Sequence, residues 1–171
     1  MKPRFTLEDL EAANDAWGCN CGPGALAAIC GLTLDEVRPH LGPAWPGYTN
    51  PTAMRNALRS VRARLNQAIG WLELDVARWP SRGLCRIQWE GPWTQPGVPA
   101  RARYRFTHWI GAATDPVRGV GIFDINVLAN GSGWCSLEDW STQVAPVLAK
   151  DHDKRATGTW HITHAIEVAL S

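Results

Sequence analysis

One cysteine in the N-terminal part of the sequence lies where a thiol can become a nucleophile. Residues 17–31 read WGCNCGPGALAAICG, and Cys21 stands two residues before a proline suited to the first turn of a helix. The free backbone amides at the start of a helix favour negative charge, and a thiolate is a far better nucleophile than a thiol. Gly22 and Gly24 leave room for a substrate backbone to approach. The stretch therefore predicts that Cys21 is a reactive cysteine.

A thiol nucleophile also needs a base, and the sequence offers a histidine far downstream. His108 lies among apolar residues in RFTHWIGAA, and Asp124 follows in GIFDIN. If these segments are neighbouring antiparallel strands, Asp124 can orient the ring of His108 and stabilise its protonated form. Asn126 would point to the same face as Asp124 and is the alternative orienting residue. The three segments together predict a triad of Cys21, His108 and Asp124.

The hydrophobic periodicity predicts helices in the first part of the chain and strands in the last part. Thr6 and the acidic residues that follow it are typical of a helix start. The order of the elements predicts an α+β fold, a single domain over 1–171. In it, N-terminal helices of about residues 1–66 pack on one face of a C-terminal antiparallel sheet of about residues 84–171. The expected helices cover 6–17, 23–30, 33–41 and 51–65, with a short one from Ser136, and the expected strands cover 84–89, 103–114, 120–128 and 159–170.

The segments NCGPGALAAICG, THWIGAA and GIFDIN, in this order, resemble the papain-like cysteine peptidases. The resemblance is closest to the bacteriocin-leader-processing branch and its Cys-Gly-Pro relatives, which are common in bacterial and phage genomes. It implies a papain-like fold in which Cys21 is the nucleophile, His108 the base and Asp124 the acid that orients the base. It covers short stretches around these residues and leaves the rest of the chain unmatched.

The sequence departs from this family before the nucleophile. The resemblance implies a glutamine six residues before Cys21, where its amide helps to hold the oxyanion, but this sequence has Asp15 there. An ionised carboxylate cannot donate a hydrogen bond, so we predict that Asn14 and the backbone amide of Cys21 hold the oxyanion. Loss of one such donor slows acyl transfer about 100–1000-fold, so an Asn14 that points away would argue against peptidase activity.

Tryptophan is the most distinctive part of the composition, with ten residues in the chain. We expect most of them in the core, and we predict that Trp93 and Trp109 shape a substrate groove, with Trp109 shielding the histidine–aspartate pair from water. The pair Cys19 and Cys21 is spaced too closely for a usual zinc site, so we expect no metal and no cofactor. The other thiols are expected to be buried apolar residues: Cys30, Cys85 and Cys135.

Composition and charge narrow the kinds of partner. The formal net charge is +1, which gives no general attraction to nucleic acid or to an anionic membrane. No run of about 20 apolar residues is present, so no membrane span is expected. The five cysteines are an odd number in no disulfide pattern, which favours the reducing cytoplasm.

These features predict a cytoplasmic thiol hydrolase that cleaves a peptide or isopeptide amide of a peptide or protein substrate through an acyl-enzyme. Two alternatives share the same residues. One is a catalytically silent binding or inhibitory protein on the same scaffold, such as a phage factor that acts on a host protein. The other is a thiol acyl or amine transferase, which product analysis with an amine acceptor separates from a hydrolase.

Overall fold

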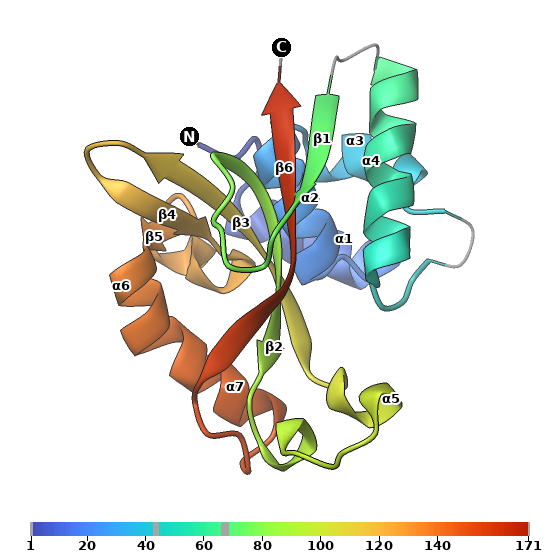
Figure 1. The fold of residues 1–171 in the computed structure, drawn as a ribbon. Helices are drawn as coiled ribbons and strands as arrows, with labels where there is room; N and C mark the ends of the chain where they lie inside the picture. The colour runs from blue at the N-terminus through green and yellow to red at the C-terminus, as the bar shows by residue number, and fades with distance from the viewer. Residues whose placement is uncertain (1, 43–44, 66–68, 171) are drawn as a thin grey trace.

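A six-stranded antiparallel sheet forms the centre of the protein (Figure 1). The computed structural model describes residues 2–42, 45–65 and 69–170. The strands lie in the order β1-β6-β2-β3-β4-β5, so the last strand of the chain is inserted between the first two. Their bounds are β1 Ile69–Leu74, β2 Arg82–Trp89, β3 Thr107–Asp115, β4 Gly119–Phe123, β5 Trp134–Ser136 and β6 Trp160–Leu170.

Both faces of this sheet carry buried apolar side chains, because successive side chains of a strand point to opposite faces. One face joins a cluster that includes Leu84, Trp109, Phe123, Ile166 and Val168. The other face joins a second cluster that includes Cys85, Ile87, Trp89, Ile110, Ala112, Ile122 and Ala165. A sheet that is apolar on both sides needs a cover on both sides, and the two clusters are completed by different helices.

The N-terminal helices cover the first face. The central one is α2, in which every residue from Gly22 to Cys30 is buried. Its C-terminal end is fixed to the sheet by Arg82, whose Nε donates to the carbonyl oxygen of Ile29 at 2.9 Å. The other elements on this side surround α2, with the bounds α1 Leu7–Trp17, α2 Cys21–Cys30, α3 Leu34–Val37, η1 Arg38–His40 and α4 Pro51–Leu65. This arrangement agrees with the predicted α+β order.

A second helical segment covers the other face and differs from the prediction. Ser136 starts a helix as expected, because its hydroxyl accepts the amide hydrogen of Asp139. The helix does not stop there but continues to His152, with Trp140, Ala145 and Ala149 buried along it. These residues form a narrow apolar stripe that the sequence analysis missed. The bounds are α6 Leu137–Asp139, a π-helical turn η4 Trp140–Val144 and α7 Ala145–His152.

Other element bounds also differ from the predicted ones. The start of the expected strand 103–114 is part of a short helix, α5 Ala100–Arg103, and the strand begins at Thr107. The expected strand 120–128 ends at Phe123, because the carboxylate of Asp124 accepts the amide hydrogen of Asn126 and turns the chain into the helical turn η3 Ile125–Asn130. The strand β1 was not predicted. A further helical turn is η2 Pro92–Thr94. Within the described ranges, no helix has the length and apolar character needed to cross a membrane.

Candidate active site

The N-terminus of α2 presents Cys21 at the surface of an otherwise buried helix. The side chain of Asn20 caps this helix by accepting the amide hydrogen of Gly22 at 3.2 Å. Cys21 is half-buried, whereas the residues after it are buried. The hydrogen bonds of residues 2–42, 45–65 and 69–170 do not include the backbone N–H of Cys21. The helix starts at Cys21 itself, and not at Pro23 as predicted, so the thiol and this free amide share the first helical residue.

Two glycines allow neighbouring chain segments to reach the thiol. A Cβ atom on Gly22 would lie 2.3 Å from Oγ1 of Thr49, and one on Gly24 would lie 2.4 Å from Cγ2 of Ile125. Real Cβ atoms do not approach other atoms so closely. The loop that carries Thr49 and the turn that follows Asp124 are therefore pressed against the start of α2.

Replacement of Gly22 by alanine is expected to disturb the site without unfolding the protein. The added methyl group must push Thr49 away from α2, so we expect slower alkylation of Cys21 by iodoacetamide and a loss of stability of about 1–3 kcal/mol. Gly121→Ala is the matched control, because its Cβ would meet only ordinary contacts of 3.5 Å or more. Equal alkylation rates in the two variants would contradict the tight contact at Gly22.

The structure brings His108 and Asp124 into direct contact. Nε2 of His108 lies 2.9 Å from Oδ2 of Asp124, and both side chains are buried. The carboxylate accepts three further hydrogen bonds: Nε1 of Trp140 donates to Oδ2 at 2.9 Å, and the backbone and side-chain amides of Asn126 donate to Oδ1 at 3.0 and 2.8 Å. A carboxylate held in this way fixes the ring of His108 and leaves Nδ1 for a second partner.

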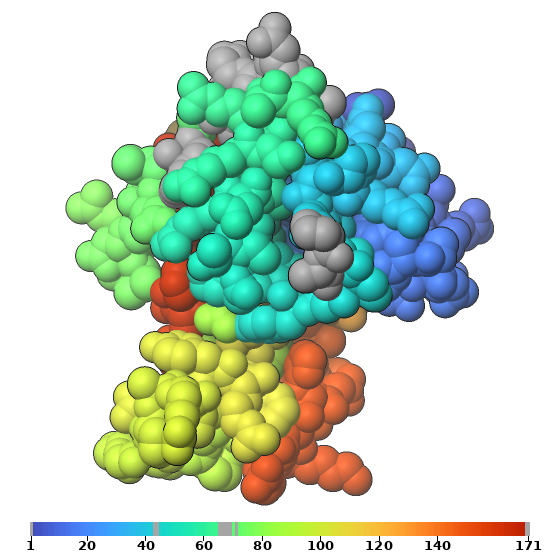
Figure 2. All heavy atoms as spheres, turned by 90° about the vertical axis from the view of Figure 1, so that its right-hand side faces the viewer, coloured from blue at the N-terminus to red at the C-terminus, as the bar shows by residue number. Residues whose placement is uncertain are grey.

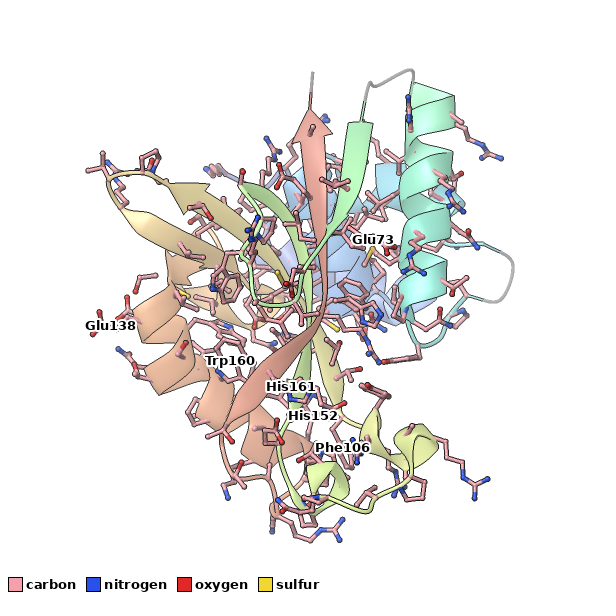
Figure 3. All side chains as sticks on the ribbon, in the orientation of Figure 1. Glu73, Phe106, Glu138, His152, Trp160 and His161 are labelled. Atoms are coloured by element: carbon pink, nitrogen blue, oxygen red, sulfur yellow. The ribbon has the colours of Figure 1, made fainter. Side chains whose placement is uncertain are left out.

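Aromatic rings shield this pair from water. The indole of Trp89 stacks on the ring of His108, with the centroids 5.9 Å apart and the planes at 22°. Trp140 stacks on the same indole at 6.0 Å, and the ring of His152 lies 6.2 Å from it. Figure 3 labels His152, which lies at the C-terminal end of α7 in the lower part of the molecule. No role for His152 was expected from the sequence. Burial, and to a smaller extent the charge of His108, lowers the pKa of its ring.

The thiol of Cys21 interacts with the ring of His108. Burial by itself raises the pKa of the Cys21 thiol, but the positive charge of His108, a hydrogen bond with its ring and one from the backbone N–H of Trp109 outweigh it, so the pKa falls below 9.0. Burial by itself lowers the pKa of His108, and the charges of Asp124 and Cys21 raise it well above 6.5. These opposite shifts favour a thiolate beside an imidazolium ring at neutral pH.

Asp124 is ionised under the same conditions. Burial alone raises its pKa, but the charge of His108 and the hydrogen bonds from His108, Trp140 and Asn126 lower it to about 2. The carboxylate therefore stays negative at neutral pH, where His108 carries its proton.

Cys21 of α2 can reach the start of β3 because β4 ends early. Pairing between β3 and β4 begins at Gly111 and Phe123, so the start of β3 has no β4 partner. The backbone N–H of Trp109 lies in this open part and donates to the sulfur of Cys21. The thiolate therefore takes the place of a neighbouring strand, which positions it beside His108.

The pKa values of the other four thiols are shifted in the opposite direction. Burial is the main cause that raises the pKa of each of them, to about 12 for Cys19, Cys30 and Cys85 and to about 11 for Cys135. All five thiols are free. Cys21 is the one whose pKa is lowered, which separates it from four unreactive neighbours.

Three sequence predictions about nearby residues are wrong. Trp109 is buried on the face covered by the N-terminal helices, where Nε1 donates to the carbonyl oxygen of Thr49 at 2.6 Å. Trp89, on the opposite face, shields His108 instead. Trp93 is buried as well, donates to the carbonyl oxygen of Trp89 and does not line an open groove. Asn126 contacts Asp124 and not His108, so it supports the orienting residue rather than replacing it.

Asn14 contacts the segment that leads into Cys21, and this contact uses part of its amide. Nδ2 donates to the carbonyl oxygen of Cys19 at 2.7 Å, which holds the chain that leads into Cys21. Asn14 and Asn20 also line a hollow of about 470 Å³, whose other walls are Leu10, Glu11, Asp15, Cys19 and Ile125. This hollow reaches Cys19 and Asn20, the two residues before Cys21, so a ligand can enter beside the start of α2.

The described part of the chain holds no cluster of three or more histidine, cysteine or acidic side chains that could bind a metal ion. Comparison with protein-family models, with curated proteins and with solved structures gave no match.

Proposed function

We propose that this chain is a papain-like thiol hydrolase that cleaves peptide or isopeptide amides. The observation that carries the proposal is the hydrogen-bonded series from Cys21 through His108 to Asp124, with the pKa shifts that favour an ion pair. The sequence resemblance implies this arrangement. A cysteine lies at the start of an N-terminal helix that packs on an antiparallel sheet, the base lies on a strand, and the acid lies at the end of the next strand. The five free thiols are in keeping with work in a reducing compartment such as the cytoplasm.

The proposed reaction has two halves. The thiolate of Cys21 attacks the carbonyl carbon, and the imidazolium of His108 donates its proton to the departing amine, which leaves an acyl thioester and a neutral ring. The neutral ring then takes a proton from water, whose oxygen attacks the thioester. Collapse of this second intermediate releases the carboxylic acid and restores the thiolate and the imidazolium. Asp124 keeps its negative charge throughout and stabilises the protonated ring.

The oxyanion of each intermediate needs fixed donors. The free backbone N–H of Cys21 is the first, because it lies on the same residue as the sulfur. The second is a side-chain amide that borders the hollow beside Cys21. Asn14 fits this role because its amide nitrogen carries a second hydrogen besides the one that is bonded to Cys19.

Incubation with a tryptic digest of a bacterial proteome is expected to test the proposal. Wild-type protein should generate new peptide ends that mass spectrometry detects, and Cys21→Ala should generate none. In water enriched in ¹⁸O, hydrolysis places one heavy oxygen in each new carboxyl group. With added glycine amide, a transferase would instead join the acyl group to the amine.

The control for this experiment is Cys19→Ala, which removes a buried thiol two residues away and should leave cleavage unchanged. Cleavage that survives in Cys21→Ala would overturn the proposal. A folded wild-type protein that cleaves nothing, although Cys21 is alkylated, would favour the catalytically silent binding protein.

A further inference from the structure

A buried positive charge lies in the sheet close to the candidate site. Arg86 of β2 is only 4% exposed. The ion pairs among the residues that the structure describes do not include it. A buried charge without a charged partner is costly, so its presence calls for an explanation.

The groups around Arg86 are neutral. Nε and Nη2 both donate to the hydroxyl oxygen of Tyr48, the first at 3.1 Å, and Nη1 lies 3.3 Å from Oγ1 of Thr163. The guanidinium carbon lies 5.6 Å from the ring centroid of Tyr48 and 5.8 Å from that of Tyr104. We call these four residues the Arg86 cluster.

The other charged groups of this region do not neutralise Arg86. Glu73 forms an ion pair with Arg55. Burial, followed by the charges of Arg86 and Arg55, lowers the pKa of His164, so its ring is neutral at pH 7. The positive charge of Arg86 is therefore available to a ligand.

The cluster is accessible from the surface although Arg86 itself is covered. Tyr48 is 54% exposed and Tyr104 is 51% exposed, and both contact the guanidinium group. Figure 2 shows the molecule narrowing between its upper and lower parts, where the chain just before α4 lies above the segment around α5. Tyr48 and Tyr104 belong to these two segments.

The cluster is also linked to the catalytic residues. Arg86 is the direct cross-strand partner of Trp109, which follows His108 and binds the sulfur of Cys21 through its amide. Tyr48 precedes Thr49, which is pressed against Gly22. Directly paired residues of two strands lie about 5 Å apart, so an extended substrate bound at Cys21 can reach the cluster with a residue close to the cleaved bond.

We propose that Arg86 binds a carboxylate of the substrate and gives the enzyme a preference for acidic peptides; this rests on the proposed function. The edge formed by Nε and Nη2 is the edge of a guanidinium group that pairs with both oxygens of a carboxylate. It is now occupied by one neutral oxygen, the hydroxyl of Tyr48. A carboxylate displaces this hydroxyl, supplies the missing negative charge and is flanked by the two tyrosine rings.

Alkylating peptides that differ in one group test the proposal. One pair is acetyl-Asp-Ala and acetyl-Asn-Ala chloromethyl ketone, and a second is iodoacetyl-Asp-amide and iodoacetyl-Asn-amide, so that the carboxylate lies on either side of the reactive carbon. A third pair, iodoacetyl-Ala-Gly as the free acid and as the amide, offers a terminal carboxylate instead of a side chain. Rates at Cys21 are divided by the rate with neutral iodoacetamide.

In at least one pair the acid is expected to react on the order of tenfold faster than the amide, because a paired carboxylate gains charge-assisted hydrogen bonds. Arg86→Met should remove this preference, and Arg86→Lys should remove most of it, since lysine keeps the charge but not the two-donor edge. Tyr48→Phe should keep or increase the preference, because it removes the competing hydroxyl; a purely structural cluster would not respond in this way.

The outcomes separate the two proposals. Fast iodoacetamide labelling of Cys21 without any acid preference, or with one that both Arg86 variants keep, would overturn the carboxylate site and leave the hydrolase proposal standing. Slow labelling of Cys21 by every reagent would overturn the hydrolase proposal, and the carboxylate site with it. If Arg86→Met does not fold, Arg86→Lys and Tyr48→Phe decide the question.

Discussion

The variant His108→Gln is expected to alkylate at Cys21 roughly tenfold more slowly than wild type at pH 6, with iodoacetamide as the reagent. In the wild type the pKa of Cys21 is lowered mainly by the charge of His108 acting against burial, so the thiolate persists as the pH falls. Glutamine can still donate to Asp124 but carries no charge, and burial then raises the pKa of the thiol. Below that pKa the rate should fall tenfold for each pH unit.

The pH profile is therefore more informative than any single rate. The wild-type rate should fall less steeply below pH 8 than the variant rate, which should climb steadily toward pH 9. The two curves should approach each other at high pH, because a thiolate of higher pKa is intrinsically the stronger nucleophile. Mass spectrometry of the alkylated peptide assigns the label to Cys21.

His152→Gln is the matched control for this experiment. His152 also lies beside Trp89, but its ring is neutral at pH 7 and the interactions that lower the pKa of Cys21 do not include it. Its profile should follow the wild type. A wild-type profile that rises with pH as that of a free thiol does would contradict the ion pair.

Asp124→Ala is expected to be the most destabilising single change in the site, with a loss of about 3–5 kcal/mol in the free energy of unfolding. The substitution leaves a charged ring at His108 and the indole N–H of Trp140 without their acceptor in a buried place. It also frees the amides of Asn126, which hold the turn that follows β4. Urea unfolding followed by tryptophan fluorescence measures the loss.

Two further variants test whether the loss of stability comes from the buried hydrogen-bond network around Asp124. Asp115→Ala removes a carboxylate that also accepts two backbone amide hydrogens, but at the exposed end of β3, so the loss of stability should be much smaller. Asp124→Asn keeps the shape and part of the hydrogen bonding, so it should recover some stability while the pKa of His108 falls. Equal losses for Asp124→Ala and Asp115→Ala would contradict the buried network.

The local start signals of the helices were predictable from sequence, and the long-range contacts of the site were predictable only in part. Thr6 and Ser136 start helices as their spacing indicates. The contact between His108 and Asp124 followed from two strands joined by a short turn. Such features depend on neighbouring residues, and these are visible in a single sequence.

The shielding of His108 by Trp89 and the Arg86 cluster could not be predicted from neighbouring residues. Trp89 and Trp109 both look like tryptophans of apolar strands, and only the pairing of β2 with β3 decides which indole covers His108. The burial of Arg86 depends on β6, whose residues lie far away in the chain. A signal for Trp140 existed in the spacing of Trp140, Ala145 and Ala149, which repeats at about one helical turn.

The position of β6 in the middle of the sheet has a consequence for synthesis on the ribosome. The strand between β1 and β2 is supplied by residues 160–170. A nascent chain that already contains Cys21, His108 and Asp124 therefore still lacks the strand that completes the sheet next to β2. Contacts between residues so distant in the chain form late in folding. We expect the thiol to stay unreactive until residues 160–170 have emerged from the ribosome and inserted between β1 and β2.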